Sequence, residues 1–174
     1  NEPAREASVS TERGTYVVAR ALYADNKEIA EELLGALFGT SSKPLVLDGD
    51  DAAAYGVVAD AVDVLLSKAD EVVVASGLEC LLAHSPDSRE ATLAALRKRH
   101  ADAVGRDADR SPVHELVACA LRMETNPSAK QRKRKDLKET IDATLALAAR
   151  LVKEERLGLR QARGGERVRL YLEA

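Results

Sequence analysis

The stretch DEVVVASG, residues 70–77, holds a continuous apolar run bounded by charged residues and a glycine. A short run of this kind is typical of a strand that is covered on both faces. A second such run lies upstream over 44–47, and the segment between them, about 52–67, places its apolar residues on one helical stripe. Strand, helix and strand within roughly 35 residues predict a βαβ unit with parallel strands.

The N-terminal part of the chain favours one further strand and one helix. Residues 15–23, TYVVARALY, are dense in β-branched and aromatic residues, with a short helix as the competing interpretation. Asp25 is a good N-cap for a helix over 26–38, and Gly39 stands where a C-terminal glycine belongs. Residues 20–37 also fit two helices around a tight turn, as in helix-turn-helix proteins. Because no polar third helix follows, the strand and helix are preferred.

Helical patterns dominate the remainder of the chain. Segments 78–83, 86–104 and 113–124 are predicted helices, and 105–112 has the composition of a loop. A long helix is expected to begin at Ala129 and to carry an apolar stripe in its later turns.

The C-terminus is expected to form a β-hairpin. Gly164 and Gly165 separate two runs of strand character. The predicted fold class is therefore α/β, with α+β as an alternative: a small parallel sheet with flanking helices, then a helical segment that ends in the hairpin. The expected organisation is a disordered tail over 1–13, an α/β domain over 14–105 and a helical region over 106–174, with the last two packed separately or as one domain.

The net charge of −3 conceals an asymmetry along the chain. Residues 1–127 hold 13 basic against 22 acidic residues, whereas 128–174 hold 13 against 7. Such a split suggests surfaces that meet different partners. The chain has one Phe, four Tyr and no Trp, which argues against a platform on which bases stack.

The two cysteines and the hydropathy bear on location. Cys80 and Cys119 lie in apolar helical contexts and make no disulfide framework, so a reduced intracellular protein is favoured. No uncharged stretch approaches the ~20 residues that span a bilayer. Since the N-terminus also has no apolar signal core, we expect a cytoplasmic protein.

Several catalytic motifs are missing from the sequence, including the P-loop, the dinucleotide-binding glycine pattern and the nucleophile elbow. Cys80 and His84, at i and i+4, could share a helix face as metal ligands. Asp48, Asp50 and Asp51 follow the first predicted strand. Because parallel strands end at one edge, these carboxylates could bind Mg²⁺ there. A Mg²⁺-dependent phosphoryl-transfer or hydrolytic enzyme is therefore one alternative; N-caps and turns are the structural explanation of the same residues.

The densest charge run of the chain is KQRKRK, residues 130–135. Ser128 and Gln131 have the spacing of a capping box, which predicts that the long helix begins between them. The run would then occupy the first two helical turns, where the macrodipole disfavours cations. A phosphate at this end would remove that penalty. The predicted binding residues in this run are Lys130, Arg132, Lys133, Arg134 and Lys135.

The predicted hairpin adds basic residues of its own: Arg160, Arg163, Arg167 and Arg169. A helix followed by a basic, glycine-tipped hairpin resembles the last helix and wing of winged-helix DNA-binding domains, over about 142–173. The resemblance implies phosphate contacts by the wing. The helix that would enter the groove, DATLALAARL, is too apolar to read base edges.

The leading functional hypothesis is a non-catalytic nucleic-acid-binding or regulatory protein that contacts the phosphates of DNA or RNA through its C-terminal third and uses no cofactor. The Mg²⁺ enzyme is the second hypothesis. The third is a protein interaction module, in which the basic run meets an acidic partner and the long helix forms a homo-oligomer.

Overall fold

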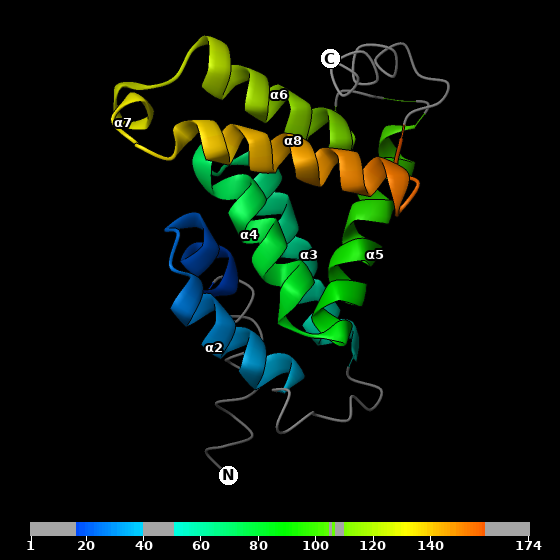
Figure 1. The fold of residues 1–174 in the computed structure, drawn as a ribbon. Coiled ribbons are helices and arrows are strands. Elements are labelled where there is room, and N and C mark those ends of the chain that lie inside the picture. Colours follow the sequence, from blue (N-terminus) through cyan, green and yellow to red (C-terminus); the bar gives the residue numbers. More distant parts are fainter. Residues whose placement is uncertain (1–16, 40–50, 105, 107–109, 159–174) are drawn as a thin grey trace. The chain divides into compact units, whose positions relative to one another are not determined.

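The computed structural model describes residues 17–39, 51–104, 106 and 110–158, and Figure 1 traces their path. Within these ranges the regular elements are helices and no strand is formed. The expected α/β fold is therefore wrong, and the described chain is all-helical. Residues 17–23 are helical. They are followed by α2 (Lys27–Phe38), α3 (Asp51–Ser67), α4 (Glu71–His84), α5 (Pro86–Ala103), α6 (Pro112–Thr125), α7 (Ala129–Arg132) and α8 (Leu137–Lys153).

The chain divides into two compact units. Unit 1 comprises Asn1–Ala69 and Ser76–Ala95, and unit 2 comprises Asp70–Ala75 and Leu96–Ala174. By sequence, unit 1 carries 15 acidic against 7 basic residues, a balance of −8, whereas unit 2 carries 14 against 19, a balance of +5. The charge asymmetry along the sequence is thus also a difference between the two units.

The apolar run at 71–75 is the first turn of α4 and not a strand. Helix α4 continues from Glu71 to His84, and its successive residues Val72, Val73 and Val74 are all buried. A helical stretch whose successive residues are all apolar and buried shows no hydrophobic period. A short apolar run of this kind cannot be distinguished from a buried strand by pattern alone. The predicted βαβ unit therefore loses its second strand, and its first, over 44–47, lies outside the described residues.

The segment over 17–38 contains two helices around a tight turn, so the predicted strand is wrong here too. Val18, Ala21 and Leu22 are buried at helical spacing. The turn places Asp25 at a positive φ of 57° and makes Asn26, rather than Asp25, the N-cap of α2, with its side chain accepting a bond from the backbone of Ile29. Gly39 ends α2 with φ of 78°, as the sequence predicted.

The core of unit 1 is built from leucines on several helices, including the fully buried Leu34, Leu65, Leu78 and Leu81. Gly77 on α4 makes the closest approach, since a Cβ atom built there would lie 2.7 Å from a methyl carbon of Leu65. Because glycine has no side chain, α3 can pack closely against α4 at this position in unit 1.

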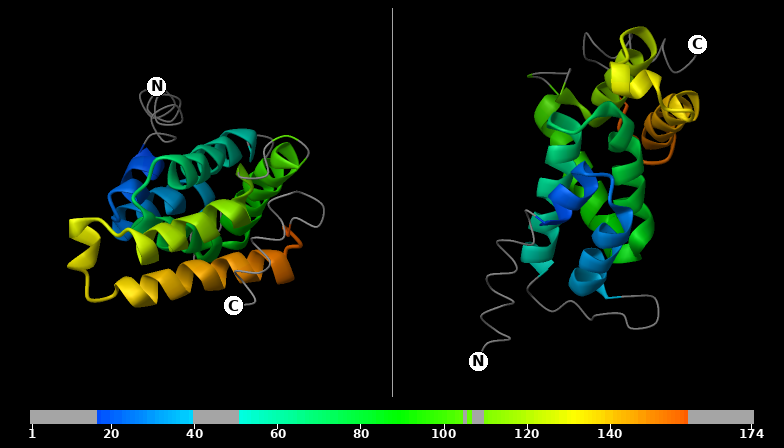
Figure 2. Two further views of the ribbon diagram at one scale, coloured as in Figure 1. Left: turned by 90° about the horizontal axis from the view of Figure 1, so that it is seen from above. Right: turned by 90° about the vertical axis from the view of Figure 1, so that its left-hand side faces the viewer.

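The core of unit 2 centres on α6 and α8, which run side by side in opposite directions in Figures 1 and 2. Their buried side chains include Leu116, Met123, Leu147 and Leu151. A stripe at i, i+3 and i+4 faces one neighbour, as expected for an amphipathic helix in a bundle. α7 forms the corner between these two helices (Figure 1).

The predicted resemblance to a winged-helix domain is wrong, as is the predicted fold class. The described residues of the C-terminal third are helical, and no sheet accompanies α8 in them. The predicted hairpin falls within 159–174, outside the described residues. Within the described ranges, no helix has the length and apolar character that crossing a membrane requires.

Candidate functional site

The predicted capping box at the start of α7 is confirmed. The Ser128 hydroxyl oxygen accepts a hydrogen bond of 3.1 Å from the backbone N–H of Gln131. In return the side-chain oxygen of Gln131 accepts one of 3.0 Å from the backbone N–H of Ser128. Two N–H groups that a helix start leaves without partners are thereby satisfied.

Gln131 also anchors α7 to the beginning of α4, within unit 2. Its side chain is 4% exposed, and its amide Nε2 donates to Oδ1 of Asp70 at 2.7 Å and to Oε2 of Glu71 at 2.9 Å. Hydrogen bonds to ionised acceptors are stronger than those between neutral groups. Both carboxylates have a second partner: Asp70 caps the backbone of Val72, and Glu71 pairs with Arg122 at 3.1 Å. A polar network of hydrogen bonds and one ion pair therefore holds this corner.

The long helix expected from Ala129 is interrupted. α7 ends after four residues, and α8 begins at Leu137. In the connection, Arg134 forms two bonds to the carboxylate of Asp136, at 3.0 and 3.1 Å. Residues at i and i+2 do not face each other on a helix, so this pair requires the interruption. Hydrogen bonding to Arg134 lowers the pKa of Asp136 below its ordinary value.

This interruption corrects the expected clash between the basic run and a helix dipole. The start of α8 carries Asp136 at its N-cap and Glu139 in its first turn, and both charges have the favourable sign there. The cations precede this helix. Lys130 and Arg132 lie in the four-residue α7, and Lys133, Arg134 and Lys135 lie in the connection between α7 and α8.

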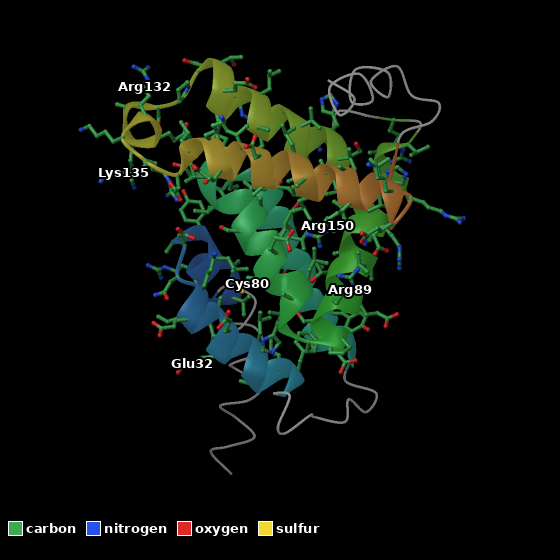
Figure 3. The ribbon with its side chains drawn as sticks, in the orientation of Figure 1. Glu32, Cys80, Arg89, Arg132, Lys135 and Arg150 are labelled. Atoms are coloured by element: carbon green, nitrogen blue, oxygen red, sulfur yellow. The ribbon has the colours of Figure 1, made fainter. Side chains whose placement is uncertain are left out.

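We call the five cations of this corner the basic turn: Lys130, Arg132, Lys133, Arg134 and Lys135. Four are exposed, and Arg134 is partly buried beside Asp136. The Nε of Arg132 donates to the carbonyl oxygen of Pro127 at 3.1 Å. Figure 3 shows Arg132 and Lys135 projecting away from the ribbon at α7. None of the three lysines makes an ion pair with a described residue. The turn thus presents cations to solvent on a fixed backbone.

The remaining predicted site residues are not brought together. Arg160, Arg163, Arg167 and Arg169 lie outside the described residues, as do Asp48 and Asp50. Asp51 is the first residue of α3. Residues 76–79, which follow the second predicted strand, lie inside α4. The proposed Mg²⁺ site therefore lacks the sheet edge that motivated it, and no cluster of three metal-ligating side chains occurs in the described ranges.

An acidic groove in unit 1 was not predicted. It is open, has a volume of about 700 Å³ and lies between α2 and the later turns of α4. Figure 3 labels Glu32 and Cys80 on its two sides. Its lining residues are Glu28, Glu31, Glu32, Gly35, Cys80, Ala83 and His84. The i, i+3, i+4 spacing of the three glutamates was visible in the sequence, but the facing helix was not.

The chemistry of this groove is limited. Burial raises the pKa of the Cys80 thiol, and the nearby Glu31 carboxylate raises it further. A protonated thiol is a poor nucleophile and a poor metal ligand. His84 contacts the carbonyl oxygen of Gly39 through Nε2 at 3.3 Å. Cys80 and His84 line the same groove, as their spacing predicted, but these contacts define no catalytic or metal centre.

Comparisons with protein-family models, with curated proteins and with solved structures found no match.

Proposed function

We propose that this protein is a non-catalytic nucleic-acid-binding protein, in which the basic turn contacts phosphate groups. The observation that carries the proposal is the concentration of five cations within six residues, on a turn whose backbone is fixed by the buried Gln131. Lysine and arginine side chains supply most of the affinity of proteins for the phosphate backbone.

The rigidity of the turn supports the proposal. Ion contacts between long, mobile side chains and a ligand lose entropy on binding, and a preorganised backbone reduces that loss. Gln131 is held by its own capping box and by two carboxylates, so the lysines on either side of it start from a defined backbone.

The net charge of unit 2 also supports the proposal that the basic turn contacts phosphate groups. A balance of +5 in this unit, against −8 in unit 1, directs an anion towards the half of the chain that bears the basic turn. Fields of this kind raise the rate of association and weaken with ionic strength. A regulatory role and a cytoplasmic location are compatible parts of the proposal.

The test is the affinity for a short labelled duplex at low and moderate salt, measured by fluorescence anisotropy with the full chain. In the test variant Lys130, Lys133 and Lys135 are replaced by Gln. Arg132 and Arg134 are kept because they also bond Pro127 and Asp136. We expect this variant to bind at least about tenfold more weakly, since three phosphate contacts are lost.

A matched control carries the same change of charge elsewhere on unit 2, at the exposed positions Lys98, Arg106 and Lys153. This control is expected to keep most of the affinity. Equal losses in both variants would reduce the effect to net charge, and the absence of binding at low salt would refute the proposal. Binding of the basic turn to an acidic protein, with none to nucleic acid, would favour the interaction-module hypothesis instead.

A further inference from the structure

The surroundings of the basic turn lack the aromatic groups on which bases stack. In the sequence of unit 2, the only Phe, Tyr or Trp is Tyr171, which lies outside the described residues. Aromatic rings provide the stacking surface on which proteins bind single strands, at about 1–3 kcal/mol per base. No described residue of unit 2 is a Phe, Tyr or Trp.

Three polar side chains beside the cations are already engaged. Both polar atoms of the Gln131 amide are bonded within the protein, and the Ser128 hydroxyl accepts from the helix backbone. Thr125, at the end of α6, donates its hydroxyl to the carbonyl oxygen of Leu121 at 2.7 Å. Amide groups of Asn and Gln are the ones that read adenine, and hydroxyl groups also contact base edges. The side chains of Thr125, Ser128 and Gln131 thus serve the fold.

Within residues 130–135, the exposed side chains are all cationic. Guanidinium groups can read guanine when they are aimed into a groove. Here, however, Arg134 is committed to Asp136, and Arg132 is bonded through Nε to the backbone of Pro127. The three lysines are flexible point charges, which suit phosphate oxygens in any sequence.

We infer that the ligand of the basic turn is the phosphate backbone of a duplex, bound without preference for base sequence and more tightly than a single strand. The inference rests on the proposed function and specifies its substrate class. A duplex presents phosphates from two strands at high density, whereas a single strand depends on stacking contacts that this surface does not provide.

The salt dependence gives a quantitative form to the inference. The logarithm of the binding constant falls with the logarithm of salt concentration by about 0.9 per phosphate neutralised on B-DNA, and by about 0.7 on a single strand. Replacing Lys130, Lys133 and Lys135 by Gln should therefore lower the slope for duplex DNA by about 2.7. Because this is a difference between two variants, contacts made elsewhere in the chain cancel.

The experiment compares the wild-type chain and the triple variant on four ligands of equal length: two DNA duplexes of unrelated sequence, an RNA duplex and a thymine-only single strand. We expect the two DNA duplexes to bind equally and the single strand more weakly. The RNA duplex shows whether the A-form or the B-form backbone is preferred.

Each outcome separates the inference from the proposed function. Single-strand affinity equal to or above that of the duplexes, or a clear difference between the two DNA sequences, would overturn the inference and leave nucleic-acid binding intact. If no ligand binds, both fail. If the duplexes bind but the triple variant keeps the full salt slope, the contacts lie elsewhere and the basic turn is not the site.

Discussion

The amide nitrogen Nε2 of Gln131 lies 2.7 Å from Oδ1 of Asp70, across a separation of 61 residues in the sequence. This bond joins the corner between α6 and α8 to the beginning of α4, within unit 2. It is formed by the buried neutral side chain of Gln131 and the carboxylate of the exposed Asp70, and a buried amide of this kind is stable only when it is bonded. The position of the basic turn thus depends on a residue that carries no charge.

Replacing Gln131 by Ala should destabilise the protein. The carboxylates of Asp70 and Glu71 would each lose a donor, and the capping box would lose its side-chain acceptor for Ser128. Loss of hydrogen bonds to charged groups costs on the order of 1–3 kcal/mol. Urea denaturation measures this as a lower midpoint. The control Lys138→Ala, at an exposed position on α8, should change stability by less than about 0.5 kcal/mol.

Gly77→Ala should destabilise unit 1. The added Cβ atom would lie 2.7 and 2.9 Å from the two terminal methyl carbons of Leu65, and a buried side chain has little room to yield. Overpacking of this kind costs about 1–3 kcal/mol. Gly56→Ala on α3 is the opposite case, because no atom lies within 4 Å of its added Cβ. Since alanine favours a helix, that change should stabilise by about 0.5–1 kcal/mol.

A double variant tests whether the clash is the cause. Shortening Leu65 to Val removes the methyl carbons that meet the new Cβ. Leu65→Val should therefore cost less stability in the Gly77→Ala background than in the wild type, as a double-mutant cycle would measure. Strictly additive losses would show that Gly77 matters for another reason.

Local signals in the sequence located the ends of most helices. Pro86 begins α5 as predicted, Gly39 ends α2, and the capping box of Ser128 and Gln131 begins α7. These features depend on backbone groups a few residues away, so they are visible without knowledge of the tertiary structure.

The fold class could not be obtained in the same way. Val72, Val73 and Val74 are consecutive and buried in a helix, where the pattern of a covered strand is the same. Gly77 bounds this apolar run in the sequence, as a turn glycine after a strand would. Its role is close packing against Leu65, which only the facing helix reveals.

The candidate site was predicted in its residues but not in its geometry. No proline or glycine occurs between Arg132 and Leu137, so no helix-breaking residue in the sequence predicts the break between α7 and α8. The break accompanies the anchoring of Gln131 to Asp70 and Glu71, and both contacts are distant in sequence. The groove lined by Glu31 and Cys80 likewise depends on two segments that meet only after folding.

The ion pair between Arg99 and Glu115 should contribute more than an exposed pair. Two bonds of 3.0 and 2.9 Å join the guanidinium to the carboxylate, and both side chains are at most 20% exposed. Glu115→Gln should cost about 1–3 kcal/mol, because it removes the charge that satisfies a half-buried Arg. Arg97→Gln, which breaks the pair with Glu155 at an Arg that is 54% exposed, should cost less than about 1 kcal/mol. Thermal denaturation of the two variants compares these losses directly; equal losses would contradict the role of burial.

The thiol of Cys119 should make stability depend on alkaline pH. Burial raises its pKa from 9.0 to about 12, and the thiol donates to the carbonyl oxygen of Glu71 at 3.4 Å. The neutral thiol therefore contributes stability that is complete below pH 9 and is lost as the pH rises towards about 12, because the unfolded chain ionises first. Measured by urea denaturation, the difference in stability between the wild type and Cys119→Ala should be constant below pH 8.5 or so and then shrink as the pH rises.

In the same protein a thiol reagent should modify the half-exposed Cys80 first and reach Cys119 only on unfolding. A pH-independent difference, or early modification of Cys119, would show that this thiol is not buried as described.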